Sequence, residues 1–409
     1  MWRHCWLAWV WAEDVTMPTT PIVADVSELA GNPIRTGIQR VVRAVLQHWP
    51  GPRPLLPCRF DAERGGLVPL PPNAVDLLTD RRAGHVALSV GEIKPLVEAA
   101  IAAGAKQPID LAGYDRILVP ELFFNPSRCR FYRDLLERQP EHARFLVYDF
   151  IPWLRPDLMW LERTHELMPY LTSLTMAGRL AFISQAIQEV YSHRILRQTD
   201  LMGVVLPLGA DGLRRSDEGD AGLARQKFRP DRRLFVAIGS IDGRKHQDRI
   251  VAAFAQLRTA GVPAELVVIG GAFTQAGAQA QARAVADAAA AHAPGIQYLP
   301  YASDAEVAAL LANARAMLYL SEAEGYGLPP IEGLDLGIPV IVGGDVPSVH
   351  ELPPLGQIRL SALTVEALKA AIIRVMDNHQ AAQLWDEAAQ LSLPSWSGFA
   401  EATAAWMHH

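Results

Sequence analysis

Residues 318–341 read LYLSEAEGYGLPPIEGLDLGIPVI, and this stretch decides the fold. Its apolar start predicts a buried strand that ends at Ser321, and a glycine-rich loop follows. The prolines at positions 329 and 330 predict the first turn of a short helix, because a missing N–H costs nothing there. Gly337 is typical of a helix C-terminus, and the apolar residues after it predict a second buried strand. This order of elements indicates a parallel α/β sheet.

Outward from this stretch, strand and helix signals alternate through the C-terminal half of the chain. Short apolar strands separated by amphipathic helices are typical of a parallel sheet that is buried on both faces. The expected strands cover residues 234–238, 265–269, 296–299, 316–320 and 338–342. The expected helices cover residues 247–259, 278–291, 304–313 and 365–378.

The N-terminal half repeats this alternation less regularly. Residues 50–75 are rich in proline and glycine, which predicts irregular loops. Residues 212–231 are charged and lack apolar periodicity, which predicts a linker between two domains. A length of 409 residues also favours two domains over one. The strands expected here cover residues 21–26, 116–119, 144–148, 180–183 and 203–207.

The composition excludes several classes of protein. Half of the residues are hydrophobic and 20% are charged, as in a compact globular protein. A net charge of −6 argues against nucleic acid as the main partner, because phosphate backbones require clustered positive charge. Cys5, Cys58 and Cys129 form neither a metal-ligand pattern nor a disulfide framework, which favours a reducing cytosol. No apolar run reaches the roughly 18–20 residues that a membrane-spanning helix needs.

The chain begins with MWRHCWLAWVWAEDVTM, which is rich in tryptophan. This segment does not resemble a signal peptide, because no A-x-A cleavage pattern follows its short apolar run. Two alternatives stay open. Either the segment is an interfacial membrane anchor, since tryptophan favours the depth of lipid headgroups, or Met17 is the true start and the residues before it are disordered or artefactual. A chain that begins at Met17 is expected to fold and function normally.

Two carboxylates frame the glycine-rich loop: Glu324 lies in the loop itself, and Glu332 follows eight positions later in the expected helix. Free backbone N–H groups at a helix N-terminus form an anion site that suits a phosphate. Carboxylates, in turn, accept hydrogen bonds from paired hydroxyls such as those of a sugar. The stretch therefore combines groups for a phosphate with groups for a sugar.

The pattern E-x7-E around GYGLP, placed after a strand, resembles the signature of the family-4 retaining glycosyltransferases of the GT-B fold. The resemblance implies that Glu324 contacts hydroxyls of the transferred sugar and that Glu332 binds the ribose hydroxyls of the donor. It also implies that the amides of Tyr326, Gly327 and Leu328 lie near the diphosphate and the sugar. The alternative is that both carboxylates are ordinary solvated or helix-start charges.

A second motif, FVAIGSIDGRKH at residues 235–246, places Arg244 and Lys245 between a strand and a helix. In the family that the chain resembles, a basic pair at this position clamps the donor diphosphate, and Gly239 lies in the turn of the same donor site. An arginine fork and a lysine point charge suit that task in different ways. A dinucleotide-binding loop is excluded, because Gly239 and Gly243 do not form G-x-G-x-x-G.

The N-terminal half matches the family more loosely. The resemblance places Gly37 in a loop whose backbone approaches the donor phosphate and sugar, with Thr36 where a second glycine is common. Tyr148 and Asp149 stand where the family usually has His-Asp, so a tyrosine hydroxyl would have to replace the histidine at the sugar. Asp149 is either a residue of the catalytic site or a cap for the turn at residues 151–152. Glu121, after another expected strand, is a weaker candidate on the acceptor side.

The resemblance implies a GT-B architecture with two Rossmann-like domains that face each other across a cleft. Residues 1–20 precede the fold, residues 21–211 form the acceptor domain, residues 212–231 the linker and residues 232–392 the nucleotide-sugar domain. Residues 393–409 resemble the family's final helix, which crosses back to the first domain.

The implied activity is a retaining transfer of sugar from a nucleotide diphosphate donor to a glycan or lipid-linked acceptor, as in bacterial polysaccharide or lipopolysaccharide assembly. No D-x-D motif occurs, so neither a metal nor any cofactor is expected. The implied location is the cytoplasm or the inner face of the cytoplasmic membrane, with peripheral membrane contact. Two alternatives stay open: a nucleotide-sugar epimerase on the same scaffold, and a non-catalytic subunit that binds nucleotide sugars.

Overall fold

The structure is a computed structural model, and it describes residues 20–34, 37–51, 53–79, 90–104, 107–158, 161–214, 223–272 and 276–409. The tryptophan-rich N-terminal segment with Met17 lies outside the described residues, as do Thr36 and part of the expected linker. Among the helices that the structure describes, none is both long and apolar enough to cross a membrane.

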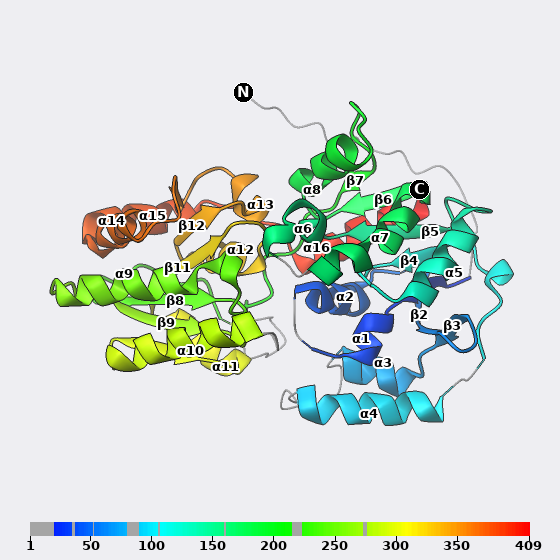
Figure 1. Ribbon diagram of the computed structural model, residues 1–409, viewed down its shortest axis with the longest axis horizontal. Helices are drawn as coiled ribbons and strands as arrows, with labels where there is room; N and C mark the ends of the chain where they lie inside the picture. Colours follow the sequence, from blue (N-terminus) through cyan, green and yellow to red (C-terminus); the bar gives the residue numbers. More distant parts are fainter. Residues whose placement is uncertain are drawn as a thin grey trace.

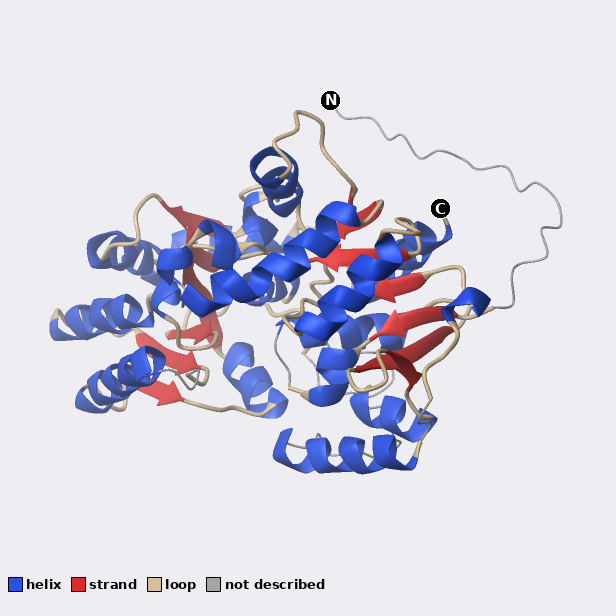
Figure 2. Ribbon diagram, turned by 45° about the vertical axis from the view of Figure 1, so that its right-hand side comes forward, coloured by secondary structure: helices blue, strands red, loops and turns tan. Residues whose placement is uncertain are grey.

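The first half of the chain forms a seven-stranded sheet in the order β3-β2-β1-β4-β5-β6-β7. All neighbouring strands are parallel except β2 and β3, which form an antiparallel edge. Figures 1 and 2 show helices on both sides of this sheet. The strands are β1 (Ile22–Asp25), β2 (Leu55–Asp61), β3 (Gly66–Pro69), β4 (Ile117–Val119), β5 (Ala143–Val147), β6 (Arg179–Phe182) and β7 (Val204–Val205). The helices are α1 (Ser27–Gly31), α2 (Gly37–His48), α3 (Pro72–Leu78), α4 (Val90–Ala103), α5 (Pro126–Leu136), α6 (Ile151–Leu154), α7 (Leu161–Met176) and α8 (Gln185–Glu189).

The prediction of irregular loops over residues 50–75 is wrong. This region holds β2, β3 and α3. Most of its prolines and glycines lie at the ends of these elements, whereas Pro57 lies inside β2. Gly65, with a φ of +65°, turns the β2–β3 hairpin, and Pro72 lies in the first turn of α3. Cys58 and Leu67 are fully buried. Burial of the apolar face therefore outweighs a composition that suggests loops.

The second half forms a fully parallel six-stranded sheet in the order β10-β9-β8-β11-β12-β13. Five of its strands lie where the sequence predicts them, while the short and partly polar β13 was not expected. The strands are β8 (Leu234–Ile238), β9 (Glu265–Ile269), β10 (Ile296–Leu299), β11 (Ala314–Ser321), β12 (Val340–Gly344) and β13 (Gln357–Leu360). The helices are α9 (Gln247–Thr259), α10 (Ala276–Ala291), α11 (Asp304–Ala312), α12 (Leu328–Asp335), α13 (Pro347–His350), α14 (Val365–Met376), α15 (Asn378–Ala389) and α16 (Trp396–His408).

The last helix, α16, belongs spatially to the first sheet and packs against α2. In Figure 1 it is the red helix among the green and blue elements. Arg116 and Arg144, which lie at the start of β4 and β5, donate hydrogen bonds to the carbonyls of Met407 and Trp406. These bonds satisfy carbonyl groups at the C-terminal end of α16 that have no partner within the helix.

One apolar cluster joins the two halves of the chain. Tyr326, Leu328 and Ile331 from the start of α12 pack in it with Leu208 and Trp396 from the two segments that connect the sheets. The glycine-rich loop therefore lies at the junction of the sheets, close to the carboxyl ends of β5 and β11. In open α/β sheets, ligands bind outside the carboxyl ends of the strands.

Candidate active site

The basic pair lies directly after β8, in a short turn of 3-10 helix at Gly243–Lys245. Asp242 caps this turn: its Oδ1 accepts a hydrogen bond from the Arg244 N–H at 3.1 Å. Its Oδ2 accepts a second bond from Arg244 Nε at 2.9 Å, which fixes the guanidinium. Gly239 leaves room for the lysine, because a Cβ there would lie 3.2 Å from Lys245 Nζ. The turn therefore presents two cations beside the end of β8.

Both cations point at Glu324, so the structure brings together two groups that the sequence singled out separately. Nη1 of Arg244 lies 2.8 Å from Oε1 of Glu324, and Nζ of Lys245 lies 3.8 Å from the same oxygen. Oε1 also accepts hydrogen bonds from the hydroxyls of Tyr319 at 2.8 Å and Ser321 at 2.9 Å. No residue in the described part of the chain donates a hydrogen bond to Oε2. The carboxylate is thus held by one oxygen and has the other available for a ligand.

The site keeps Glu324 ionised. Burial alone would raise the pKa of this carboxyl, but the charges of Lys245 and Arg244 and the hydroxyl of Tyr319 lower it below its ordinary value. Burial acts in the opposite direction on Lys245 and lowers its pKa, although Glu324 partly offsets this. A buried lysine beside a single carboxylate gains from a further anion, and a phosphate would supply one.

The glycine-rich loop touches the opposite sheet. A Cβ on Gly325 would lie 2.2 Å from the carbonyl oxygen of Tyr148, at the end of β5, so only glycine fits there. Oγ of Ser184 donates a hydrogen bond to the carbonyl of Gly325 at 3.0 Å, and the hydroxyl of Tyr326 donates to the carbonyl of Leu208 at 3.1 Å. The loop, which belongs to the second half of the chain, is therefore held by residues of the first half.

The loop leads into α12 through a left-handed residue. Gly327 has a φ of +97° and forms the N-cap of the helix, a conformation that favours glycine. Its carbonyl accepts a hydrogen bond from Ser348 Oγ at 2.7 Å. A Cβ on Gly37, at the start of α2, would lie 3.9 Å from Leu328. The structure thus brings Gly37 next to the predicted amide site at Tyr326, Gly327 and Leu328.

Tyr148 and Asp149 lie at the end of β5, beside this loop. The hydroxyl of Tyr148 donates a hydrogen bond to the carbonyl of Pro120 at 2.7 Å, and the side chain is buried. Contact of this hydroxyl with a sugar stays a prediction: its proton is engaged with Pro120, so the oxygen would meet the sugar as a hydrogen-bond acceptor. Oδ1 of Asp149 accepts a hydrogen bond from the Ile151 N–H at 3.1 Å, which is the turn cap that the sequence offered as one alternative.

Asp149 is also coupled electrostatically to Arg244 and Glu324. Burial raises the pKa of its carboxyl, the positive charge of Arg244 opposes this rise, and the negative charge of Glu324 adds to it. Asp149 can therefore cap the turn at residues 151–152 and interact with Arg244 at the same time.

Glu332 is held across the junction by a residue that the sequence did not single out. The Glu332 side chain, in α12, is only 3% exposed. Arg40, in α2, donates through Nη1 to its Oε2 at 3.2 Å and through Nη2 to its Oε1. Only the position of Arg40, three residues after Gly37, could have indicated this contact.

A second ion pair crosses the junction near the end of β11. Nη2 of Arg155 lies 2.8 Å from Oε2 of Glu322, and Oε1 of Glu322 lies 2.9 Å from Nε2 of His246. Glu322 comes two residues before Glu324, and His246 follows Lys245 directly. This pair therefore ties the segment beside the basic pair to α6 of the first domain.

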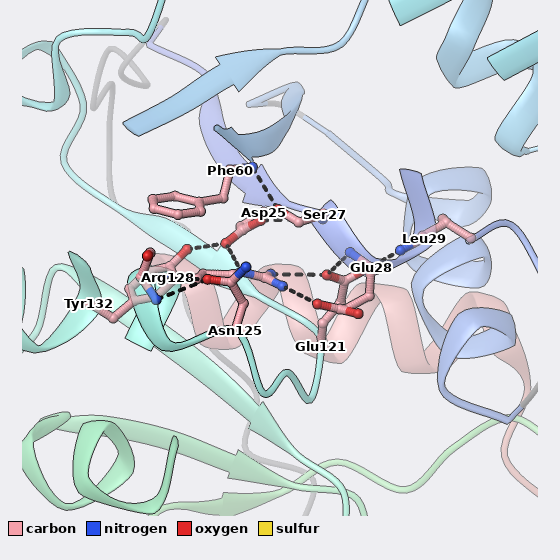
Figure 3. A network of polar contacts seen from close by, with 10 residues as sticks. Asp25, Ser27, Glu28, Leu29, Phe60, Glu121, Asn125, Arg128 and Tyr132 are labelled. Carbon is pink, nitrogen blue, oxygen red and sulfur yellow. Dashed lines mark hydrogen bonds and ion pairs between the residues drawn. The ribbon is translucent and has the colours of Figure 1, made fainter. Parts of the chain in front are cut away.

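The weaker candidate, Glu121, lies in a separate buried network (Figure 3). Its Oε1 accepts a hydrogen bond from the Leu29 N–H at 2.8 Å, and its Oε2 accepts from the Glu28 N–H at 2.8 Å. Nη2 of Arg128 donates to the same Oε2 at 3.0 Å. Burial raises the pKa of Glu121 to about 7, against the opposing charge of Arg128. Both oxygens are thus engaged in holding the N-terminus of α1 to α5.

Arg128 is the centre of that network and is fully buried. Its Nε donates to Asp25 Oδ2 at 2.8 Å, and its Nη1 donates to Glu28 Oε1 at 3.2 Å. Tyr132 adds a hydroxyl bond to Asp25 at 2.5 Å, and the guanidinium carbon lies 3.9 Å from the ring centre of Phe123. Among the described residues, no group of three or more His, Cys, Asp or Glu side chains could hold a metal ion.

Comparison with protein families matches residues 222–392 to the model described as Glycosyl transferases group 1. The serotype-specific mannosyltransferase WbdA of Escherichia coli is 25% identical over 373 residues, which cover 85% of this chain and 41% of WbdA. The chain thus spans about two fifths of the length of this relative. A GDP-mannose-dependent alpha-(1-6)-phosphatidylinositol dimannoside mannosyltransferase of Mycobacterium tuberculosis is 33% identical over 141 residues, 34% of this chain and 35% of that protein.

Solved structures share the fold across almost the whole chain. Sucrose-phosphate synthase from Thermosynechococcus elongatus superimposes with a TM-score of 0.62 at 17% identity, covering 94% of this chain and 98% of that one. HepE from Anabaena, solved with UDP and glucose, gives a TM-score of 0.61 at 15% identity, covering 95% of this chain and 98% of that one. These likenesses confirm the predicted GT-B fold with its two parallel α/β sheets.

Proposed function

We propose that this chain, whose residues 222–392 match the model of the glycosyl transferases group 1, transfers a sugar from a nucleotide diphosphate donor to an acceptor. The observation that carries the proposal is the arrangement of Arg244 and Lys245 around Glu324, beside the loop at the start of α12. It combines fixed cations for a diphosphate with a carboxylate for sugar hydroxyls, at the carboxyl end of a parallel sheet.

The donor would bind mainly to the second domain. Arg244, Lys245 and the amides of Tyr326, Gly327 and Leu328 would hold its diphosphate, since oriented N–H groups and cations both favour an anion. Glu324 would accept hydrogen bonds from the sugar through its second oxygen, and Glu332 would accept them from the ribose. The backbone at Gly37 would approach the donor phosphate and sugar. The acceptor would bind on the first domain, where Tyr148 and Asp149 face the same loop.

We further propose that the transfer retains the anomeric configuration and needs no metal or other cofactor. The bond between the anomeric carbon and the phosphate oxygen breaks, and the acceptor oxygen bonds to that carbon on the same face. The acceptor proton passes to the departing phosphate oxygen, so no protein nucleophile is required. Arg244 and Lys245 would stabilise the developing diphosphate anion in a site that excludes water.

The names of the relatives make GDP-mannose the first donor to test, with a glycan or lipid-linked acceptor of polysaccharide or lipopolysaccharide assembly. Such a reaction would take place in the cytoplasm or at the inner face of the cytoplasmic membrane. An epimerase would instead need acid and base groups on both sides of the sugar, and the hydroxyl of Tyr148 is engaged with Pro120. A non-catalytic subunit would bind the donor without releasing a nucleoside diphosphate.

A panel of donors tests the proposal. Purified protein is incubated with GDP-mannose, UDP-glucose and other nucleotide sugars, together with an acceptor extract, and released nucleoside diphosphate is measured. We expect release with one donor, and the same nucleotide should raise the melting temperature through mass action. A melting shift without release would favour the non-catalytic subunit, and formation of an isomerised donor would favour the epimerase.

We expect Glu332→Ala to weaken donor binding by about 1–3 kcal/mol, because ribose hydroxyls would be left without an acceptor. Isothermal titration calorimetry with the donor measures the change. Asp335→Ala is a matched control, because it removes a buried carboxylate from the same helix that pairs with Arg214 at 2.6 Å. An unchanged donor affinity in the Glu332 variant would remove its role at the ribose.

A further inference from the structure

The ion pair between Arg40 and Glu332 lies where the chain crosses between the two domains. The Ala210 N–H donates a hydrogen bond to the carbonyl of Pro394 at 2.8 Å, which joins the outgoing and returning segments. The Trp396 N–H donates to Asp211 Oδ1 at 2.8 Å in the same place. Any relative motion of the domains has to bend these two segments.

Gly212 is in close contact with the ion pair itself. A Cβ at this position would lie 2.6 Å from Nη2 of Arg40, 2.7 Å from Oε1 of Glu332 and 2.9 Å from Nε1 of Trp396. The ion pair is therefore packed against Gly212, in the segment that leaves the first domain. The geometry of the ion pair depends on how the two domains meet.

The geometry of the pair leaves Glu332 able to bind a ligand. Each of its oxygens accepts one bond from the planar guanidinium, one from Nη1 and one from Nη2. A carboxylate has roughly four acceptor positions, so about two remain for hydroxyl groups. A two-point contact also fixes the plane of the carboxylate, which a lysine could not do. The Glu332 side chain is 3% exposed, so without Arg40 its carboxylate would be a buried charge that has lost its ionic partner.

We propose that Arg40 is the positioning residue of the donor site: it orients Glu332 for the ribose, and it does so only when the domains are closed. The inference rests on the proposed function, because it takes Glu332 as the ribose acceptor. Arg40 comes from the acceptor domain and Glu332 from the donor domain, so the ribose site is complete only when the two meet.

Donor binding and domain closure are then coupled through this pair. A nucleotide that needs an oriented Glu332 binds the closed arrangement better, and it favours that arrangement by the same factor.

The test compares wild type with Arg40→Gln and Gly212→Ala, using GDP and UDP as probes. Arg40→Gln removes the cation, whereas Gly212→Ala displaces the pair and leaves both charges in the chain. We expect both variants to bind the preferred nucleotide on the order of tenfold more weakly, as for the loss of one contact of about 1.4 kcal/mol. We also expect KM for the donor to rise while kcat changes little, because a contact in the ground state is lost.

The matched control is Arg155→Gln, which breaks the other ion pair across the junction and leaves Glu332 untouched. It should change nucleotide affinity less than twofold. Small-angle scattering adds a second readout: the nucleotide should make wild type and the control more compact, but not Arg40→Gln. Melting temperatures without nucleotide show whether each variant is folded.

Three results would overturn the inference. If wild type binds a nucleotide and Arg40→Gln binds it equally well, Arg40 does not position Glu332, although the proposed function survives. If Arg155→Gln loses as much affinity as Arg40→Gln, any contact across the junction suffices. If wild type binds neither GDP nor UDP nor any other nucleotide of the donor panel, the inference and the proposed function both fail.

Discussion

An Arg244→Ala, Lys245→Ala double variant is expected to transfer sugar on the order of 10²–10³-fold more slowly than wild type. In other enzymes, the removal of a hydrogen-bond donor that stabilises a developing anion slows the reaction by this factor. Both cations face Glu324, at 2.8 and 3.8 Å from its Oε1, so both are already in place when a diphosphate departs. Their preorganisation costs nothing during the reaction, which is why their loss should appear mainly in kcat.

The measurement is the steady-state release of nucleoside diphosphate, with each variant checked for folding by thermal denaturation. Arg244 also donates to Asp242, so a lower melting temperature is expected as well. Lys369→Ala, Arg374→Ala removes the same two charges from α14 in the same domain and should leave turnover near that of wild type. Near wild-type turnover of the Arg244, Lys245 variant would refute the role of the basic pair.

Arg128→Ala is expected to lower the free energy of unfolding by about 3–5 kcal/mol, because removal of one partner leaves buried carboxylates unpaired. Arg128 donates to Asp25, Glu28 and Glu121, and both Asp25 and Glu121 are buried. Urea denaturation measures the loss. The control is Arg130→Ala in the same helix, an exposed arginine whose loss should change stability by less than about 0.5 kcal/mol.

The loss at Arg128 should also depend on pH. Burial raises the pKa of Glu121 to about 7 from an ordinary value of 4.5, so the folded state binds this proton more tightly than the unfolded chain does. The resulting stabilisation is fully present below pH 4.5 and is lost as the pH rises through about 7. Without Arg128 the ionised carboxylate has no cation beside it, so the variant should be more destabilised at pH 8 than at pH 5. A loss that is equal at both pH values would contradict this account of the network.

The second domain could be predicted well because its determinants are local. Each buried strand there is a short apolar run beside an amphipathic helix, so β8, β9 and β10 and helix α9 occur at the expected residues. The β2–β3 hairpin was missed because its prolines and glycines suggest loops. Only the finished sheet shows that most of them lie at the ends of elements and that β2 accommodates Pro57 within it. The strand β13 has too few apolar residues to stand out.

The site was predictable to the same extent. Glu324 and the basic pair each lie in a local motif after a strand, so the sequence could single out both. They meet because β11 and β8 are neighbours in the sheet, which only the structure shows. Arg40 and Glu332 are 292 positions apart, and Arg128 and Asp25 are 103 apart. Such pairs depend on how whole elements pack, and no local pattern encodes that.

The most direct test of the central claim is proton NMR of the reaction with GDP-mannose and an acceptor extract, run in excess chelator. The account predicts release of the nucleoside diphosphate and a new glycosidic signal whose anomeric configuration equals that of the donor. An inverted product would contradict it, as would activity that chelation abolishes and Mg²⁺ or Mn²⁺ restores. Absence of transfer from GDP-mannose and from every other donor of the panel would contradict it entirely.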